Sequence, residues 1–290
     1  MPTLETIPAP PALPEKQREA LISLLADDDP AVYSMVRSKL LAFGPTASQW
    51  LRPYTLSSDP TLRRRAVEIV VHQARRASDL RFLEFCNRNG EDLDLEEATG
   101  LLAQTRHPDA NLDGYRALFD TWADDVRSRI ETMASTETVL TILNKFLFEK
   151  LAFKGNEQYA FEPDACYINR IVDKRSGNPI GLCAISLFMA RRLRLPVAGI
   201  GLPGHFICRY QGSKQEIFVD CFRRGAFLSK ADCVKHLLQT HISYGENQLS
   251  PVRPRRMLLR MCHNLVSTYG HLEMTDEARR VQRYVRALTK

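Results

Sequence analysis

Apolar residues recur every three or four positions along the first ninety residues, the spacing of helices with one buried face. Segments 25–45 (LLADDDPAVYSMVRSKLLAFG) and 55–75 (YTLSSDPTLRRRAVEIVVHQA) repeat one arrangement, in which Asp-Pro precedes the helical spacing. Asp29 and Asp59 are suited to cap these helices, because a carboxylate accepts hydrogen bonds from free backbone N–H groups and proline fits the first turn. The front of the chain is therefore predicted to consist of paired helices.

The helical spacing continues from residue 92 to residue 150 and then stops. Gly, Asn and Pro interrupt it in 152–165 (AFKGNEQYAFEPDA), which is predicted to be a loop. A short helix is expected over 166–175. In the stretch GNPIGLCAISLFMARRL, a strongly apolar helix is expected from about Leu182 to Leu193.

After this helix the apolar spacing changes from helical to strand-like. Segments 195–202, 205–212 and 215–222 are short, rich in Val, Ile and Phe, and separated by Gly, so they are predicted to be strands. The second and third are expected to be joined by a turn at Gly212-Ser213. Alternate residues of HFICRY are expected on opposite faces of the strand: His205, Ile207 and Arg209 on one, and Phe206, Cys208 and Tyr210 on the other.

Helices are again predicted in the last part of the chain. One is expected to begin at Ser229, whose spacing to Asp232 suits a capping box, and two more cover 255–272 and 275–288. Helices before and after a small antiparallel sheet make the predicted fold α+β. We expect a mostly helical chain whose sheet packs on the central helix that carries Cys183.

The composition is that of a folded globular protein, with 44% apolar and 26% charged residues. No apolar run approaches the roughly 18 residues that a membrane span needs, so no membrane association is expected. Residues 1–14 are Pro-rich, and we expect a flexible leader rather than a signal peptide. The seven cysteines are scattered and none has zinc-ligand spacing, so we expect free thiols, a cytoplasmic protein and no metal site.

The formal net charge of +6 is concentrated at the C-terminal end. Residues 251–290 contain nine Lys and Arg against three acids, and the rest of the chain is neutral. A basic segment can bind nucleic acid, but these arginines alternate with Leu, Met and Val at helical spacing. That pattern is typical of an ordinary solvated helix face, so nucleic-acid binding is not expected.

Cys183 lies near the expected start of the apolar helix. A thiol at a helix N-terminus can ionise readily, because the free N–H groups and the helix dipole lower its pKa. The same N–H groups can bind a developing oxyanion. The plainer interpretation is a core residue, since cysteine is among the most buried residue types. The stretch around Cys183 leaves both interpretations open.

His205 and Asp220 make the catalytic interpretation more specific. His205 begins the second strand, directly after the turn in GLPGH, and Asp220 ends the third strand. A hairpin turning at Gly212-Ser213 would place the two almost opposite each other, because His205 precedes Gly212 by as many residues as Asp220 follows Ser213. Cross-strand neighbours lie about 5 Å apart, which would let Asp220 orient the imidazole.

The order of a Cys at a helix start, a His on a strand and an Asp on the next strand resembles that of the transglutaminase-like superfamily, relatives of the papain-type proteases. The phrases R-x-G-x-P-I, ARRL-x-LPV, GLPGHF and F-x-D-x-F-x-x-G, within residues 92–241, are similar to those of its SirB-type subgroup. The front helices are similar to HEAT-type repeats, although two unrelated capped helices would give the same pattern. The expected division is a leader (1–14), a HEAT-like segment (15–91), a transglutaminase-like domain (92–245) and a tetratricopeptide-like hairpin (246–290).

The resemblance implies a cysteine hydrolase or acyltransferase with Cys183 as nucleophile, His205 as base and Asp220 as orienting acid. Asn178 and Asn156 are candidate side-chain donors near the site, and an Asx-type turn is the plainer role for Asn156. The thiol would attack an amide or ester carbonyl and form a thioester. Water would complete a protease, amidase or deamidase reaction, and an amine would give crosslinking. A protein or peptide substrate and no cofactor are expected.

Two other functions fit the same sequence. One is a non-catalytic adaptor, in which helical repeats flank a degenerate enzyme domain and bind protein partners. The other, which rests only on the basic residues of 251–290, is a nucleic-acid-associated factor. The remaining histidines singled out, His236, His241 and His263, have no partner spacing and are interpreted as surface or helix residues.

Overall fold

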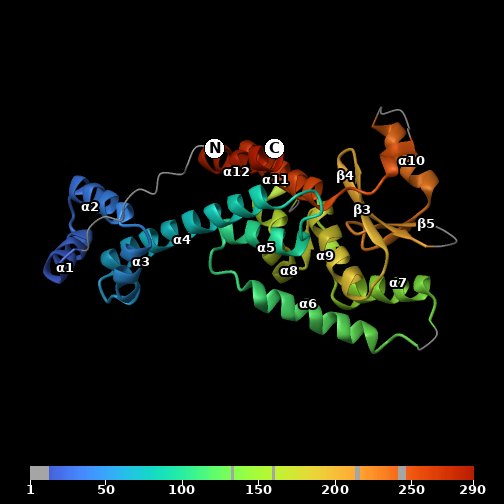
Figure 1. Ribbon diagram of the computed structural model, residues 1–290, viewed down its shortest axis with the longest axis horizontal. Helices are drawn as coiled ribbons and strands as arrows, with labels where there is room; N and C mark the ends of the chain where they lie inside the picture. Colours follow the sequence, from blue (N-terminus) through green and yellow to red (C-terminus); the bar gives the residue numbers. More distant parts are fainter. Residues whose placement is uncertain (1–12, 132–133, 159–160, 213–215, 241–245) are drawn as a thin grey trace. The chain divides into compact units, whose positions relative to one another are not determined.

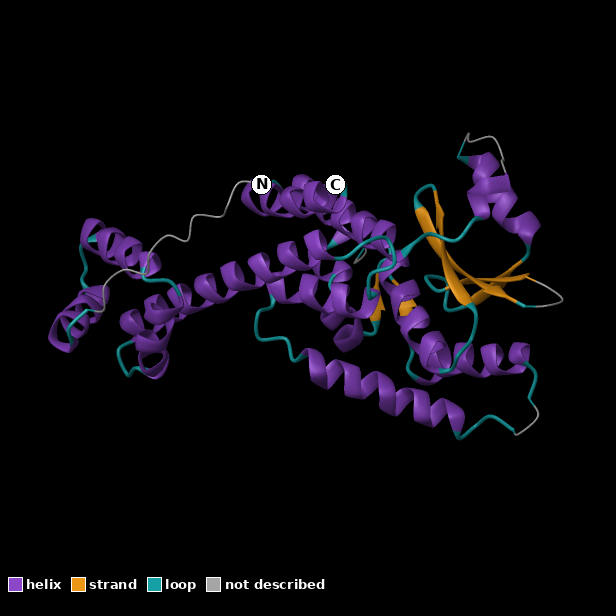
Figure 2. Ribbon diagram, viewed as in Figure 1, coloured by secondary structure: helices purple, strands orange, loops and turns teal. Residues whose placement is uncertain are grey.

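The computed structural model describes residues 13–131, 134–158, 161–212, 216–240 and 246–290. These form two compact units, Met1–Leu80 with Thr105–Pro108, and Arg81–Gln104 with Asp109–Lys290. Residues 1–12 of the expected leader (1–14) lie outside the described residues, and so does His241. The predicted α+β class is confirmed, since the chain is mostly helical and carries a four-stranded antiparallel sheet (Figure 2).

The first unit is helical and has its own core. Its elements are α1 (Glu15–Ser23), η1 (Leu24–Ala26), α2 (Pro30–Ala42), α3 (Pro45–Leu51), η2 (Arg52–Leu56) and the first part of α4 (Pro60–Arg88). The carboxylates of Asp29 and Asp59 each accept a 2.8 Å hydrogen bond from the backbone N–H of the second residue of the helix that follows, which confirms both caps. The buried residues come from α1, η1, α2, α3 and α4: Leu21, Ile22, Leu25, Val36, Leu40, Ala47, Leu51, Ala66 and Ile69.

The second unit contains the remaining helices that precede the sheet. They are α5 (Leu95–Arg106), α6 (Leu112–Arg127), α7 (Thr136–Lys145) with its π-helical extension η3 (Phe146–Lys150), η5 (Pro163–Cys166), α8 (Ile168–Lys174) and α9 (Pro179–Arg192). Two short strands, β1 (Lys154–Gly155) and β2 (Ser176–Gly177), pair in parallel. Each has only two residues, too few for a strand-like spacing to be recognised in the sequence.

The main sheet has the order β3 (Val197–Leu202), β4 (His205–Gln211), β5 (Glu216–Asp220) and β6 (Ala226–Leu228), all antiparallel. The three predicted strands are confirmed, and β6 was missed. The predicted register of β4 and β5 was wrong by two residues, since Cys208 pairs with Val219 rather than with Ile217. The Ser213 half of the predicted turn lies outside the described residues. A two-residue change keeps every side chain on its predicted face.

The two faces of the sheet are covered by different helices. Helix α9 packs against β3 and β4, and α10 (Lys230–Gln239) packs against β5 and β6 on the other side (Figure 1). Ser229 caps α10 through the predicted capping box with Asp232. Phe206, Cys208 and Tyr210 belong to the core cluster of α9, whereas Ile207 belongs to the cluster of α10. The alternation predicted for HFICRY is therefore confirmed.

The chain ends with the short helix η6 (Glu246–Leu249) and the helices α11 (Pro254–His271) and α12 (Thr275–Leu288), the last two lying side by side (Figure 1). Several of the arginines that give this region its charge have hydrogen-bond or ion-pair partners within the chain. Arg255 donates to four backbone carbonyls and Arg260 to two, while Arg279 and Arg280 pair with acids of their own helix. The basic character of 251–290 thus serves the fold to a large extent.

Candidate functional site

Helix α9 begins earlier than the sequence spacing suggested. Its first residue is Pro179, and the side-chain oxygen of Asn178 caps it by accepting from the Gly181 N–H at 2.9 Å. Cys183 is therefore the fifth residue of the helix, and its predicted position at the helix N-terminus was wrong. Only the first four N–H groups of a helix lack an intrahelical partner, so the N–H of Cys183 is not available to an oxyanion.

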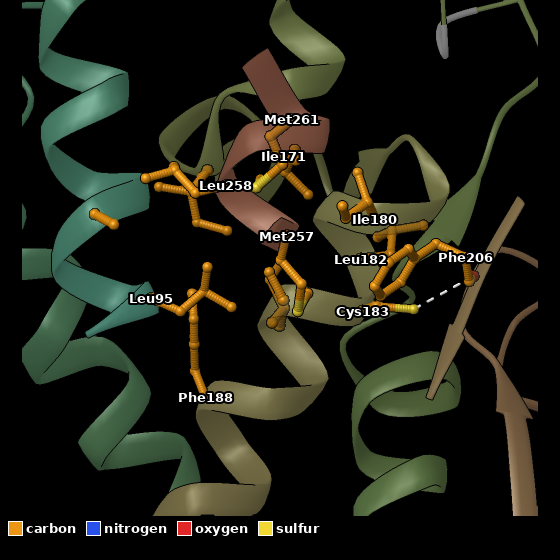
Figure 3. Packing of buried hydrophobic residues seen from close by; sticks show 14 of the residues in the cluster. Leu95, Ile171, Ile180, Leu182, Cys183, Phe188, Phe206, Met257, Leu258 and Met261 are labelled. Carbon is orange, nitrogen blue, oxygen red and sulfur yellow. Dashed lines mark hydrogen bonds between the residues drawn. The ribbon is translucent and has the colours of Figure 1, made fainter. Parts of the chain in front are cut away.

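The Cys183 thiol is enclosed by the core. The residue is 0% exposed, and its Sγ donates to the carbonyl oxygen of Phe206 at 3.5 Å (Figure 3). Its sulfur lies with those of Cys208 and Cys221, all three within 4.8 Å of one another. Burial, followed by hydrogen bonding to the other two thiols, raises the pKa of Cys183 well above that of a free thiol. At neutral pH this cysteine is an uncharged thiol without access to solvent.

His205 and Asp220 do lie together. The imidazole Nε2 and the carboxylate Oδ2 of Asp220 are 2.9 Å apart, and the side chains are 16% and 2% exposed. The other carboxylate oxygen accepts from the backbone N–H groups of Phe222 and Arg223 at 3.0 and 3.1 Å. Burial raises the pKa of Asp220, but the hydrogen bond and charge of His205 and the Arg223 N–H together lower it below the ordinary value. An ionised carboxylate thus holds one ring nitrogen of His205.

The sheet separates this pair from the Cys183 thiol. Residues 205 and 208 differ by an odd number along β4, so their side chains project to opposite faces of the sheet. The thiols of Cys208 and Cys221 lie on the α9 face with Cys183, and the His205 ring lies 5.9 Å from that of His236 on α10. The structure therefore brings together two members of the predicted triad and places the third on the other side of the sheet.

His205 lines a cavity of about 400 Å³. The residues around it come from the loop after β1, the start of α9, the β3–β4 turn, the turn after β5 and one face of α11: Glu157, Phe161, Asn178, Pro179, Gly204, His205, Phe222, Asn264, Ser267 and Thr268. Pro179, the first residue of α9, is the residue of that helix that lines the cavity. Among the described lining residues there is no cysteine.

The two candidate asparagines have structural partners. The amide nitrogen of Asn178 lies 3.1 Å from Cys166 Sγ, and its oxygen caps α9, so its side chain is engaged on both sides while it lines the cavity. The oxygen of Asn156 accepts from the Gln158 N–H at 3.1 Å. That is the Asx-type turn favoured by the sequence.

The turn that precedes His205 is held in place by hydrogen bonds from a half-buried side chain of α11. Leu202 pairs with His205, and Pro203 and Gly204 form the connection, with Gly204 at a φ of 66° that favours glycine. The guanidinium of Arg260 donates to the carbonyls of Leu202 and His205 at 2.7 and 2.9 Å. This charged clamp holds both ends of the turn in place.

A second and larger cavity, of about 970 Å³, lies on the other side of this turn. Arg253, Arg256 and Arg260 of the α11 region line it, and the acid among its lining residues is Glu91. Among the described residues that line it there is no cysteine or histidine. Its positive charge suits a negatively charged ligand.

Sequence reasoning missed some of the residues that surround these sites. His236 was interpreted as a surface or helix residue and does lie in α10, but its contacts were not foreseen: its Nε2 lies 3.0 Å from the Pro203 carbonyl oxygen and its ring is beside His205. Cys208 and Cys221 were not singled out, because cysteines 25 and 38 residues from Cys183 have no motif spacing. The one sequence feature that indicated where Cys208 lies was the alternation of faces along β4.

Known proteins resemble this chain over the region that builds the site. A family model described as the transglutaminase-like superfamily matches residues 113–263. The chain belongs to the transglutaminase-like superfamily. A UPF0162 protein of Xylella fastidiosa is 30% identical over 198 residues, covering 66% of this chain and 70% of that protein. F-box only protein 21 of Homo sapiens is 30% identical over 151 residues, covering 48% of this chain and 23% of its own length. No solved structure matches the chain.

Membership of this superfamily does not by itself show which reaction, if any, the chain catalyses. Thiol catalysis requires the nucleophile within hydrogen-bond reach of its base, about 2.6–3.2 Å. Here the histidine lines a cavity, Pro179 at the start of α9 lines it too, and the Cys183 thiol is buried and is not among the lining residues. What the arrangement provides is an oriented imidazole in a polar and aromatic cavity.

Proposed function

We propose that this chain is a protein-binding member of the transglutaminase-like superfamily, which holds a segment of a partner protein without forming a thioester. The observation that carries the proposal is the separation of Cys183 from His205 by the sheet. In its place beside the imidazole stands Pro179, which has neither a nucleophilic atom nor an N–H group.

The two cavities suit one extended ligand. They flank the Pro203–Gly204 turn and share helix α11, where Arg256, Arg260, Asn264 and Ser267 recur at three- and four-residue steps and so lie on one helix face. One end of this surface is basic and the other is polar and aromatic. We propose a peptide segment with acidic residues in the larger cavity and an uncharged portion at His205.

The flanking helices fit this function as additional contact surfaces. The assignment of the front helices to a HEAT-like segment and of α11 and α12 to a tetratricopeptide-like hairpin remains part of the proposal, as does membership of the SirB-type subgroup. The seven cysteines are free thiols. Free thiols are typical of a reducing compartment, so we propose that the protein is cytoplasmic. No described helix is long and apolar enough to cross a bilayer.

The second candidate is the cysteine acyl-transfer reaction that the resemblance implies. It is favoured by superfamily membership and by the presence of the His205–Asp220 pair. It requires the buried Cys183 thiol to reach the cavity that His205 lines, from which it is absent in this structure. The two candidates therefore differ in whether Cys183 is needed.

A direct binding experiment distinguishes them. A fluorescein-labelled peptide with four consecutive glutamates is titrated by fluorescence anisotropy against the same peptide with four lysines. We expect saturable binding of the acidic peptide, a loss of about tenfold or more in Arg256→Glu, and unchanged binding in Cys183→Ala. Arg279→Glu, an exposed arginine on α12, is the matched control. Equal affinity for both peptides, or release of a cleaved or deamidated product, would contradict the proposal.

A further inference from the structure

We propose that Cys183, Cys208 and Cys221 form a buried binding site for one thiophilic divalent metal ion of the zinc and cadmium class. This three-thiol site is separate from the cavity at His205 and independent of the proposed peptide binding. Its residues come from α9, from β4 and from the turn directly after β5, which meet on the α9 face of the sheet.

The spacing of the sulfurs is that of ligands around a single ion. A zinc–sulfur bond is about 2.3 Å long, so the sulfurs of a tetrahedral site lie about 3.8 Å apart. The sulfurs of Cys208 and Cys221 are 3.7 Å apart, and all three lie within 4.8 Å of one another. An ion at their centre thus requires small movements of side chains rather than a rearrangement of the sheet.

The donor atoms decide the class of ion. Three sulfurs in an apolar core favour thiophilic ions and disfavour magnesium and calcium, which prefer oxygen ligands. Three thiolates leave a net charge of −1 around a divalent ion but −2 around monovalent copper. Because buried charge is costly, the divalent ion is preferred.

The surroundings supply a further polar group. Ser186 lies one helical turn after Cys183, and its Oγ is 3.2 Å from the Cys221 sulfur. A hydroxyl at this distance can donate a hydrogen bond to a coordinated thiolate, as groups around metal ligands commonly do. Binding is a simple exchange, in which three S–H bonds break, three metal–sulfur bonds form and three protons leave to solvent.

The three residues are 0–1% exposed, so the ion has to enter as the chain folds. The test therefore unfolds the full chain under reducing, metal-free conditions and refolds it with and without Cd²⁺. We expect one equivalent of bound cadmium, ultraviolet cadmium–thiolate absorption, three protons released per ion and a raised thermal midpoint. X-ray absorption of the wild-type complex is expected to show three sulfur neighbours.

Matched variants locate the site. Cys208→Ala and Cys221→Ala are expected to lose at least tenfold in cadmium affinity, whereas Cys86→Ala and Cys262→Ala, which remove buried thiols outside the cluster, are expected to retain it. If the first two variants do not fold, the wild-type sulfur count decides. The proposal is overturned if cadmium has fewer than three sulfur neighbours, if less than one equivalent binds, or if the control variants lose binding equally.

Discussion

The side chains of His205 and Asp220 are joined by a 2.9 Å contact although the strand register does not place them opposite each other. Extension of the pairing of Cys208 with Val219 puts Asp220 across from Ile207, two residues further along β4. Residues two positions apart along a strand project to the same face of the sheet, so the His205 ring can contact Asp220 diagonally. The contact between the two side chains thus depends on their projecting to the same face of the sheet more than on their lying directly opposite each other.

This pairing makes the stability of the fold depend on pH. The folded-state pKa of Asp220 is lowered, so its contribution is present above the unfolded value of about 4 and is lost as the pH falls through the folded value. We expect Asp220→Asn to reduce the free energy of unfolding by about 1–3 kcal/mol at pH 7. The difference from wild type is expected to shrink towards pH 3. Urea unfolding at both values measures it.

The control for that comparison is Asp276→Asn, which removes an exposed carboxylate paired with Arg279. Surface pairs of this kind contribute little, so a change within about 0.5 kcal/mol is expected at both pH values. An Asp220→Asn effect of equal size at pH 3 and pH 7 would show that the charge of Asp220 does not stabilise the fold.

The cap of α9 is a second structural element of the site. Asn178→Ala removes the acceptor of the Gly181 N–H, and we expect a loss of about 1 kcal/mol in the free energy of unfolding. Ser267→Ala, at an exposed position that lines the same cavity, is expected to be neutral. Thermal or urea unfolding of the three proteins tests this. An unchanged stability of Asn178→Ala would mean that the cap is replaced by solvent.

Gly155 sets the position of Phe222, which lines the cavity beside His205. A Cβ at residue 155 would lie 2.3 Å from the Phe222 ring, so the ring has to move in Gly155→Ala. Overpacking of this kind costs about 1–3 kcal/mol. We expect lower stability together with weaker peptide binding. Gly90→Ala, where the added Cβ would meet nothing within 4 Å, is the control, and equal effects of both variants would refute the packing argument.

Much of the fold could be predicted because the signals are local. The bounds of α12 match the expected helix over 275–288, and the caps Asp29 and Ser229 are where their spacing placed them. Strand alternation also needs only neighbouring residues, and it assigned Phe206 and Cys208 to one face correctly.

The site was harder to predict because it depends on contacts between distant segments. The start of α9 was placed at the first apolar residues, although Asn178 and Pro179 are themselves a capping signal four residues earlier. The alternation along β4 separated His205 from Cys208 but could not tell which face α9 would cover. That choice, made by packing, decides whether Cys183 meets the imidazole or the other thiols.

The central claim is that Cys183 is not a nucleophile, and its reactivity tests this most directly. Native protein is treated with iodoacetamide from pH 6 to pH 9, and labelling of each cysteine is followed by mass spectrometry. Pro179→Cys serves as the positive control, since it places a thiol at the helix start in the His205 cavity.

We expect Cys183 to remain unlabelled across this range, to react only when the protein is unfolded in urea, and to behave identically in His205→Ala. The thiol of Pro179→Cys is expected to react in the native protein, faster with His205 present than without it. Selective labelling of native Cys183 with a midpoint below about 8.5, lost in His205→Ala, would contradict the account and favour the acyl-transfer enzyme.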